Sequence, residues 1–180
     1  HVQSSKYVVH AMMKLGWKFG DSKTITVDSL ADTLRIVPEH RHLFSRMIDI
    51  LVEDGILIQD GDSLKCISQP PADDPVDEWR TLIRKYPAYH AELSLLHRCG
   101  SHLAEVLRGE DDPLSLIFPA NSLLTEHLYH DAPSFRYYNR LMQLIMRTIV
   151  DSVPEGQPLR ILEIGAGTGA MASQLLPVLP

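Results

Sequence analysis

The first 67 residues show helical and strand-like hydrophobic patterns in turn. Apolar side chains recur at helical spacing over residues 4–19 and again over residues 39–53. Residues 24–27 alternate like a short strand, and apolar runs on both sides of Asp60-Gly61-Asp62 predict a hairpin. The predicted order is helix, strand, two helices and hairpin, which is typical of a winged-helix unit over residues 1–67.

A proline-rich and aspartate-rich stretch at residues 68–77 has no apolar period and predicts a linker. Helical apolar stripes follow it and are broken at Pro87 and Gly100, and another helix is predicted over residues 134–150. The passage over residues 113–138 contains several prolines and is expected to be loop-rich. It is also so apolar that it must pack against other parts of the protein. These patterns predict a second, mainly helical unit over residues 78–153.

The pattern changes again at residues 154–180. A short apolar run at residues 159–164 predicts a strand that leads into Gly165-Ala166-Gly167-Thr168-Gly169, and a helix is predicted from about Ala170. Glycines allow a sharp turn and a close approach to a ligand, and a helix start offers free N–H groups. We expect a mainly α chain with a winged-helix-like N-terminal unit, ending in the first strand-loop-helix of a Rossmann-like α/β domain.

Two nucleotide-like cofactors can use such a loop. Gly165, Gly167 and Ala170 satisfy the dinucleotide fingerprint G-x-G-x-x-G/A. Glu163 at the end of the strand and the third glycine at 169 favour S-adenosylmethionine instead, and a long leader before the loop is unusual for a dehydrogenase. A structural glycine turn is a third alternative, whereas a P-loop is excluded because no Gly-Lys-Ser/Thr follows.

Charge and cysteine content narrow the partners and the compartment. Lys and Arg number 17 against 23 Asp and Glu, and the net charge of −6 gives no basic field for nucleic acid or an anionic membrane. Cys66 and Cys99 lie far apart and no apolar run is long enough to cross a bilayer, so a cytoplasmic location is expected. The ends at His1 and Pro180 indicate a piece of a longer polypeptide.

No metal site and no nucleic-acid site are expected. His90, His97 and His102 lack the i, i+4 spacing of a helical metal site and are expected to be solvated or to cap helices. Arg41 and Arg46 lie on the helix that reads DNA in winged-helix proteins, but acidic residues share their neighbourhood.

Residues 163–169 resemble motif I of S-adenosylmethionine-dependent methyltransferases. Residues 123–140, including Leu128-Tyr129-His130-Asp131-Ala132-Pro133 and Arg136-Tyr137-Tyr138-Asn139-Arg140, resemble the segment before motif I in carbon methyltransferase domains of polyketide synthases. The order of winged-helix-like lid, helical lid and glycine loop resembles that family too. The resemblance is strongest over residues 113–176.

The resemblance implies a binding site for S-adenosylmethionine. Glu163 would lie near the amino acid end of the cofactor, and Tyr129, Phe135 and Tyr138 would line the cofactor pocket, with ordinary core packing as the alternative for each aromatic. Asn139 would orient a substrate carbonyl or lie on the helix surface. The candidate cofactor-binding residues are Glu163, Gly165, Ala166, Gly167, Gly169, Tyr129, Phe135 and Tyr138.

The resemblance also implies the reaction, which is methylation of the α carbon of a β-ketoacyl chain carried by an acyl carrier protein, among neighbouring synthase domains. A histidine partnered by a glutamate would be the base, and both are expected after residue 180, so no catalytic residue is assigned and this chain alone is expected to be inactive. Two alternatives stay open. One is an inactive methyltransferase-derived adaptor in a synthase loading module, and the other is a fragment of a small-molecule O-methyltransferase.

Overall fold

The chain folds as two compact units. The computed structural model describes residues 2–20, 24–70, 73–119 and 123–179. The first unit comprises His1–Lys85 and Leu96–Pro119, and the second unit comprises Tyr86–Leu95 and Ala120–Pro180.

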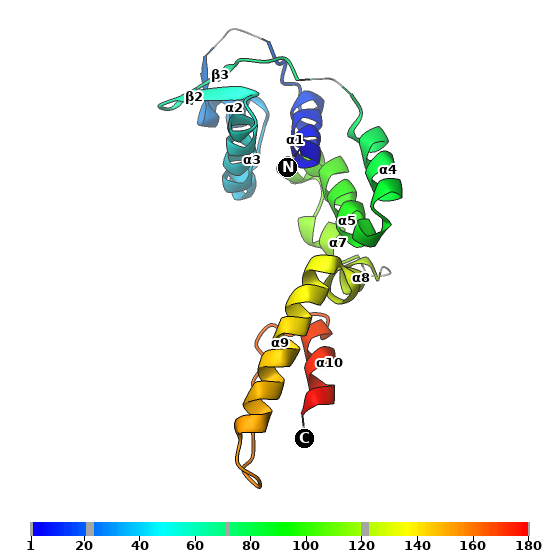
Figure 1. Ribbon diagram of the computed structural model, residues 1–180. Coiled ribbons are helices and arrows are strands. Elements are labelled where there is room, and N and C mark those ends of the chain that lie inside the picture. The colour runs from blue at the N-terminus through cyan, green and yellow to red at the C-terminus, as the bar shows by residue number, and fades with distance from the viewer. Residues whose placement is uncertain (1, 21–23, 71–72, 120–122, 180) are drawn as a thin grey trace. The chain divides into compact units, whose positions relative to one another are not determined.

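The first unit begins with the predicted winged-helix order. Its elements are α1 (Val2–Lys14), β1 (Ile25–Thr26), α2 (Val27–Thr33), the 3-10 turn η1 (Pro38–His40), α3 (Arg41–Glu53), β2 (Leu57–Asp60) and β3 (Ser63–Cys66). The strands form one antiparallel sheet in the order β1-β3-β2. Leu57 lies opposite Cys66 across the β2–β3 hairpin, so the predicted hairpin is confirmed (Figure 1).

The apolar faces of α1, α3 and the sheet close a core in the first unit. Met12, Phe44, Ile48 and Leu51 are 0% exposed, and they pack with Leu64 of β3. Burying each such side chain contributes about 1.5–3 kcal/mol. This core supplies the main stability of the winged-helix-like part.

Further helices complete the first unit, and α5 crosses the division between the units. The first unit contains α4 (Pro75–Lys85), α6 (Leu103–Leu107) and α7 (Pro113–Ile117), the 3-10 turn η2 (Pro87–Tyr89) belongs to the second unit, and α5 (His90–Ser101) has residues in both. Helix α1 packs against α4 and α6. Gly100 is the last residue but one of α5, and the helix break predicted there follows one residue later, between Ser101 and the start of α6 at Leu103. The ring of Tyr7 occupies the space that a Cβ of residue 100 would need, so this glycine serves close packing and not chain reversal.

An aromatic cluster joins α1, α4 and α5. The hydroxyl of Tyr7 lies 2.8 Å from Nδ1 of His97. The ring of Trp79 stacks on the imidazole with 4.2 Å between ring centroids. Burial lowers the pKa of His97 and raises the pKa of Tyr7. The expectation of a solvated or capping histidine is therefore wrong at His97, which is part of the packing between helices.

The second unit is built around one long helix. Its further elements are α8 (Leu124–Asp131), α9 (Pro133–Ser152), α10 (Ala170–Leu175) and the 3-10 turn η3 (Leu176–Val178). Helix α9 packs against α8 and α10, and Figure 1 shows the short α10 beside part of α9. Ala132 is extended and Pro133 occupies the first turn of α9, where a missing N–H costs nothing. The loop-rich passage predicted over residues 113–138 is wrong in part, because it contains α7, α8 and the start of α9.

Helix α9 leaves much of its apolar surface exposed. The exposed apolar face of α9 consists of Tyr137, Tyr138, Leu141, Leu144, Ile145 and Ile149. Among the described residues of the second unit, the fully buried positions are few and small, such as Ala132 and Ala170. The second unit thus has amphipathic helices without a closed core of large side chains.

Candidate functional site

The glycine loop before α10 has the backbone that its sequence requires. Gly165, Gly167 and Gly169 have φ of +75°, +56° and +72°. The N–H of Gly169 donates to the carbonyl of Ala166 at 2.8 Å, and Gly169 is the N-cap of α10. A Cβ at Gly165 or Gly169 would meet nothing within 4 Å, so the positive φ, and not crowding, demands glycine here.

The strand predicted before the loop is not formed. Residues 159–164 adopt neither helix nor strand, and Leu162 and Ile164 are 84% and 88% exposed. A parallel strand of this kind needs neighbouring strands to satisfy its backbone and cover both faces. The only sheet among the described residues lies in the first unit, and it pairs β1, β2 and β3. The helix predicted from about Ala170 is confirmed as α10.

The acidic candidate and the first part of the loop lie at the surface. Glu163, Gly165, Ala166 and Gly167 are all exposed, and Gly169 is half-buried. The carboxylate of Glu163 makes no hydrogen bond or ion pair with the rest of the described chain. These groups are therefore available to a ligand.

The three aromatic candidates do not form one wall. Tyr129 of α8 and Phe135 of α9 meet edge to face with 4.8 Å between ring centroids, and both are half-buried. Tyr138 is 61% exposed and instead contacts Tyr137 at 5.5 Å between centroids. Two of the aromatics thus hold α8 to α9, and the third belongs to the exposed apolar face of α9.

Asn139 holds the same two helices together. Its side chain is buried, with 7% of the residue exposed, and its Nδ2 donates to the carbonyl of Tyr129 at 3.0 Å. A helix-surface asparagine, one of the two alternatives predicted for this position, is wrong. The amide is used to fix α9 against α8.

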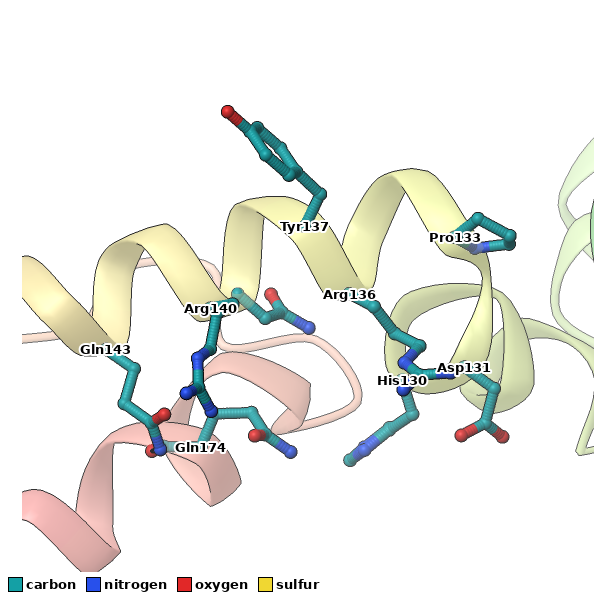
Figure 2. Close-up of a pocket in the computed structure, with 9 residues that line it drawn as sticks. His130, Asp131, Pro133, Arg136, Tyr137, Arg140, Gln143 and Gln174 are labelled. Atoms are coloured by element: carbon teal, nitrogen blue, oxygen red, sulfur yellow. Dashed lines mark hydrogen bonds between the residues drawn. The ribbon is translucent and has the colours of Figure 1, made fainter.

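A hollow of about 950 Å³ lies within the second unit beside these contacts. Figure 2 shows Arg140 and Gln143 pointing from α9 towards Gln174 of α10, while Arg136 extends towards the end of α8. The lining residues are His130, Asp131, Pro133, Arg136, Tyr137, Asn139, Arg140, Gln143 and Gln174. None of the residues predicted to bind the cofactor lines it. The signal that sequence analysis missed is the polar stripe at positions 136, 140 and 143, which share one helical face.

Comparison with known proteins relates the whole chain to one kind of enzyme domain. The CurJ carbon methyltransferase is 34% identical, and its crystal structure matches 99% of this chain with a TM-score of 0.95. The non-reducing polyketide synthase subA of Metarhizium robertsii is 32% identical over 170 residues, which are 91% of this chain. The chain belongs to the carbon methyltransferase domains of polyketide synthases.

This carbon methyltransferase chain spans only part of its relatives. It covers 48% of the CurJ carbon methyltransferase and 8% of the Metarhizium synthase. Methylphloroacetophenone synthase of Cladonia uncialis is 30% identical over 177 residues, which are 96% of this chain and 7% of that synthase. The CMeT domain of the citrinin polyketide synthase, at 24% identity and a TM-score of 0.83, shares the fold over 98% of this chain and 48% of its own. No protein family model matches the chain.

Homology to carbon methyltransferases implies an S-adenosylmethionine-dependent domain. The glycine loop fits such a cofactor in two respects. Open space lies beside Gly165 and Gly169, and Glu163 offers a carboxylate without a partner among the described residues. Acceptor oxygens of this kind suit the hydroxyl and ammonium groups of a nucleoside linked to an amino acid.

Other functional chemistries find little support in the described part of the carbon methyltransferase chain. Arg41 forms an ion pair with Asp32, and Arg46 contacts Glu53 at 2.7 Å, so these arginines of the winged-helix-like part are engaged with acids. No group of three or more His, Cys, Asp or Glu within the described ranges could hold a metal ion. None of the helices described is long and apolar enough to span a membrane.

Proposed function

We propose that this chain is the lid and the first cofactor loop of a domain that transfers a methyl group from S-adenosylmethionine to the α carbon of a β-ketoacyl chain on an acyl carrier protein. The observation that carries the proposal is the match to the CurJ carbon methyltransferase over 99% of the chain at a TM-score of 0.95. Residues 1–67 and 78–153 are assigned to the lid, residues 68–77 to the linker between its parts, and residues 154–180 to the start of the cofactor core.

The loop at 165–169 is assigned to the cofactor. S-adenosylmethionine supplies an electrophilic methyl group when bound. The loop's part is to bring backbone close to the cofactor, which the glycines permit because no Cβ stands in the way. Glu163 accepts hydrogen bonds at the amino acid end. Tyr129 and Phe135 act indirectly in this scheme, since they hold α9 against α8.

The exposed apolar face of α9 and residues 159–164 are assigned to contacts with the rest of the domain. The chain covers 48% of the CurJ methyltransferase, so about as much chain again belongs to such a domain. Leu162 and Ile164 alternate with Glu163 and are almost fully exposed, as expected of a strand that lacks its neighbours. In the complete domain, residues 159–164 become the first strand of a parallel sheet.

The reaction needs a base that removes the α proton of the β-ketoacyl chain, and we assign it to the part of the domain outside these 180 residues. Carrier protein and neighbouring synthase domains are the partners this function requires. The relative from Metarhizium is named a non-reducing polyketide synthase, and the one from Cladonia is named methylphloroacetophenone synthase. These names support a place within a multidomain synthase.

Calorimetric titration of S-adenosylhomocysteine tests the proposal. The titration is made into this chain and into the chain extended through the rest of its domain. We expect binding to the extended form only, followed by methylation of a β-ketoacyl carrier protein when S-adenosylmethionine is supplied. An extended form that binds neither cofactor nor product contradicts the proposal and favours an inactive adaptor.

Two glycine variants of the extended form make the test specific to the loop. Gly167→Ala and Gly156→Ala both place a Cβ at a positive φ, +56° and +79°, and each costs about 1–2 kcal/mol of backbone strain. Gly156 lies outside the loop, in an open turn where a Cβ would meet nothing within 4 Å. We expect Gly167→Ala alone to weaken product binding, by about tenfold or more. Equal losses in both variants would show that strain, and not the loop, is responsible.

A further inference from the structure

Helix α9 presents two arginines to the hollow of the second unit. Arg136 and Arg140 are one helical turn apart and both line the hollow, together with His130 of α8 and Gln174 of α10. Tyr137 also lines the hollow, although its ring extends away from the arginines in Figure 2. The side chains that reach the hollow from α9 are therefore mostly hydrogen-bond donors.

The walls of this hollow are fixed by two hydrogen bonds. Nδ2 of Asn139 donates to the carbonyl of Tyr129 at 3.0 Å, which sets the distance between α9 and α8. Nε2 of Gln143 donates to the carbonyl of Gln174 at 3.0 Å, which does the same for α9 and α10. The arginines thus stand on a helix that is held to α8 and to α10, so the backbone that carries them is in place before a ligand binds.

The charges in the hollow are not balanced. Neither guanidinium forms an ion pair or a side-chain hydrogen bond with the described residues, although Asp131 lines the same hollow. Two like charges four residues apart on a helix repel each other. One carboxylate faces two guanidinium groups here, so an anion that bridges Arg136 and Arg140 would relieve this repulsion.

We propose that Arg136 and Arg140, assisted by His130, form an oxyanion site that binds a phosphate or carboxylate group. Guanidinium forks suit both groups because they donate two parallel hydrogen bonds to paired oxygens. The hollow, at about 950 Å³, is large enough for the group that carries the anion.

The identity of the anion rests on the proposed function, which supplies two sources. One is the phosphate of the phosphopantetheine arm that carries the acyl chain. The other is the carboxylate at the amino acid end of the cofactor. Both sources share the chemistry that the arginines recognise, and binding measurements separate them.

Titration calorimetry on the full chain, in a phosphate-free buffer of low ionic strength, tests the site directly. The probes are inorganic phosphate and coenzyme A, with pantetheine as the phosphate-free comparison. We expect Arg136→Gln and Arg140→Gln each to weaken anion binding about tenfold, and the affinity to fall as salt is added. Asp131→Asn should tighten binding, because it removes the competing carboxylate.

Arg147→Gln is the matched control. Arg147 lies on the same helix and is also exposed, but it does not line the hollow. All four variants change exposed side chains, and circular dichroism checks that the helices are retained. The site is refuted if wild-type chain binds none of the anions, or if Arg147→Gln weakens binding as much as Arg136→Gln.

The extended chain distinguishes the two sources. S-adenosylhomocysteine is compared with methylthioadenosine, which lacks the carboxylate, in the wild type and in Arg136→Gln/Arg140→Gln. If the double variant loses affinity for coenzyme A alone, the site binds the phosphate. If it loses affinity for S-adenosylhomocysteine alone, the site binds the carboxylate. Unchanged affinity for every anion in the double variant overturns this inference alone, whereas failure of the wild-type extended chain to bind the cofactor product overturns the proposed function.

Discussion

The two units use their apolar residues in opposite ways. In the first unit, large side chains from α1, α3 and the sheet meet one another, and Phe44 and Ile48 are 0% exposed. In the second unit, the longest helix packs against α8, the short α10 and η3, and Leu144 is 49% exposed. Amphipathic patterns alone therefore do not make a core. A helix such as α9 becomes stable by tertiary packing only when enough partners cover its apolar face.

The largest effect is expected in the core of the first unit. Phe44→Ala should cost about 3–5 kcal/mol of unfolding free energy, because a large cavity is left in a closed core. Leu144→Ala on α9 should change stability by less than about 0.5 kcal/mol in this chain. Urea unfolding measures both, by tryptophan fluorescence for the first unit, which contains Trp17 and Trp79, and by circular dichroism for α9.

The Leu144→Ala variant should behave differently in the extended chain. There Leu144→Ala should cost about 2–5 kcal/mol if the rest of the domain covers this residue. A cost that stays near zero in the extended chain would show that the apolar face of α9 has another purpose.

A smaller change in stability is expected where α1 packs against α5, and its direction distinguishes packing from helix propensity. Helix propensity alone predicts that Gly100→Ala stabilises the helix by about 1 kcal/mol. The ring of Tyr7 occupies the position of the new Cβ, so we expect destabilisation by about 1–3 kcal/mol instead. Urea unfolding, monitored by tryptophan fluorescence, shows whether Gly100→Ala raises or lowers the free energy of unfolding.

The smallest effect is a pH dependence confined to the first unit. Burial lowers the pKa of His97 below its ordinary value of 6.5, so the folded state binds a proton less readily than the unfolded state. The first unit should therefore lose stability as the pH falls below about 6.5. The urea midpoint of the tryptophan signal at pH 7.5 and 5.5 measures this loss. In His97→Gln the difference between the two midpoints should shrink, and an unchanged difference would assign it to other groups.

The sequence predicted the parts of the fold that local patterns determine. The winged-helix order and the β2–β3 hairpin follow from apolar period and turn residues, and both are present. The break predicted at Gly100 occurs just after Ser101, but the contact of Gly100 with the ring of Tyr7 has no signal in the local sequence. The strand at residues 159–164 was expected from its composition, but strand formation depends on neighbours that composition does not supply.

The candidate site was predicted less completely than the fold. The glycine loop turns sharply as predicted, and the positive φ angles of Gly165, Gly167 and Gly169 are ones that glycine adopts without steric cost. The role of Asn139 depends on a carbonyl ten residues away, and the hollow at Arg136 and Arg140 depends on how α8, α9 and α10 pack. Such features arise from tertiary contacts, which one-dimensional periodicity does not encode.

The central claim is that residues 154–180 are the start of a methyltransferase core whose other strands lie outside this chain. Amide hydrogen exchange at residues 159–164 tests it most directly, in this chain and in the chain extended through the rest of the domain. We predict that these amides exchange rapidly in the chain alone. In the extended form their exchange rates should fall by about a hundredfold or more, because the amides enter a sheet. Equally rapid exchange in both forms would contradict it.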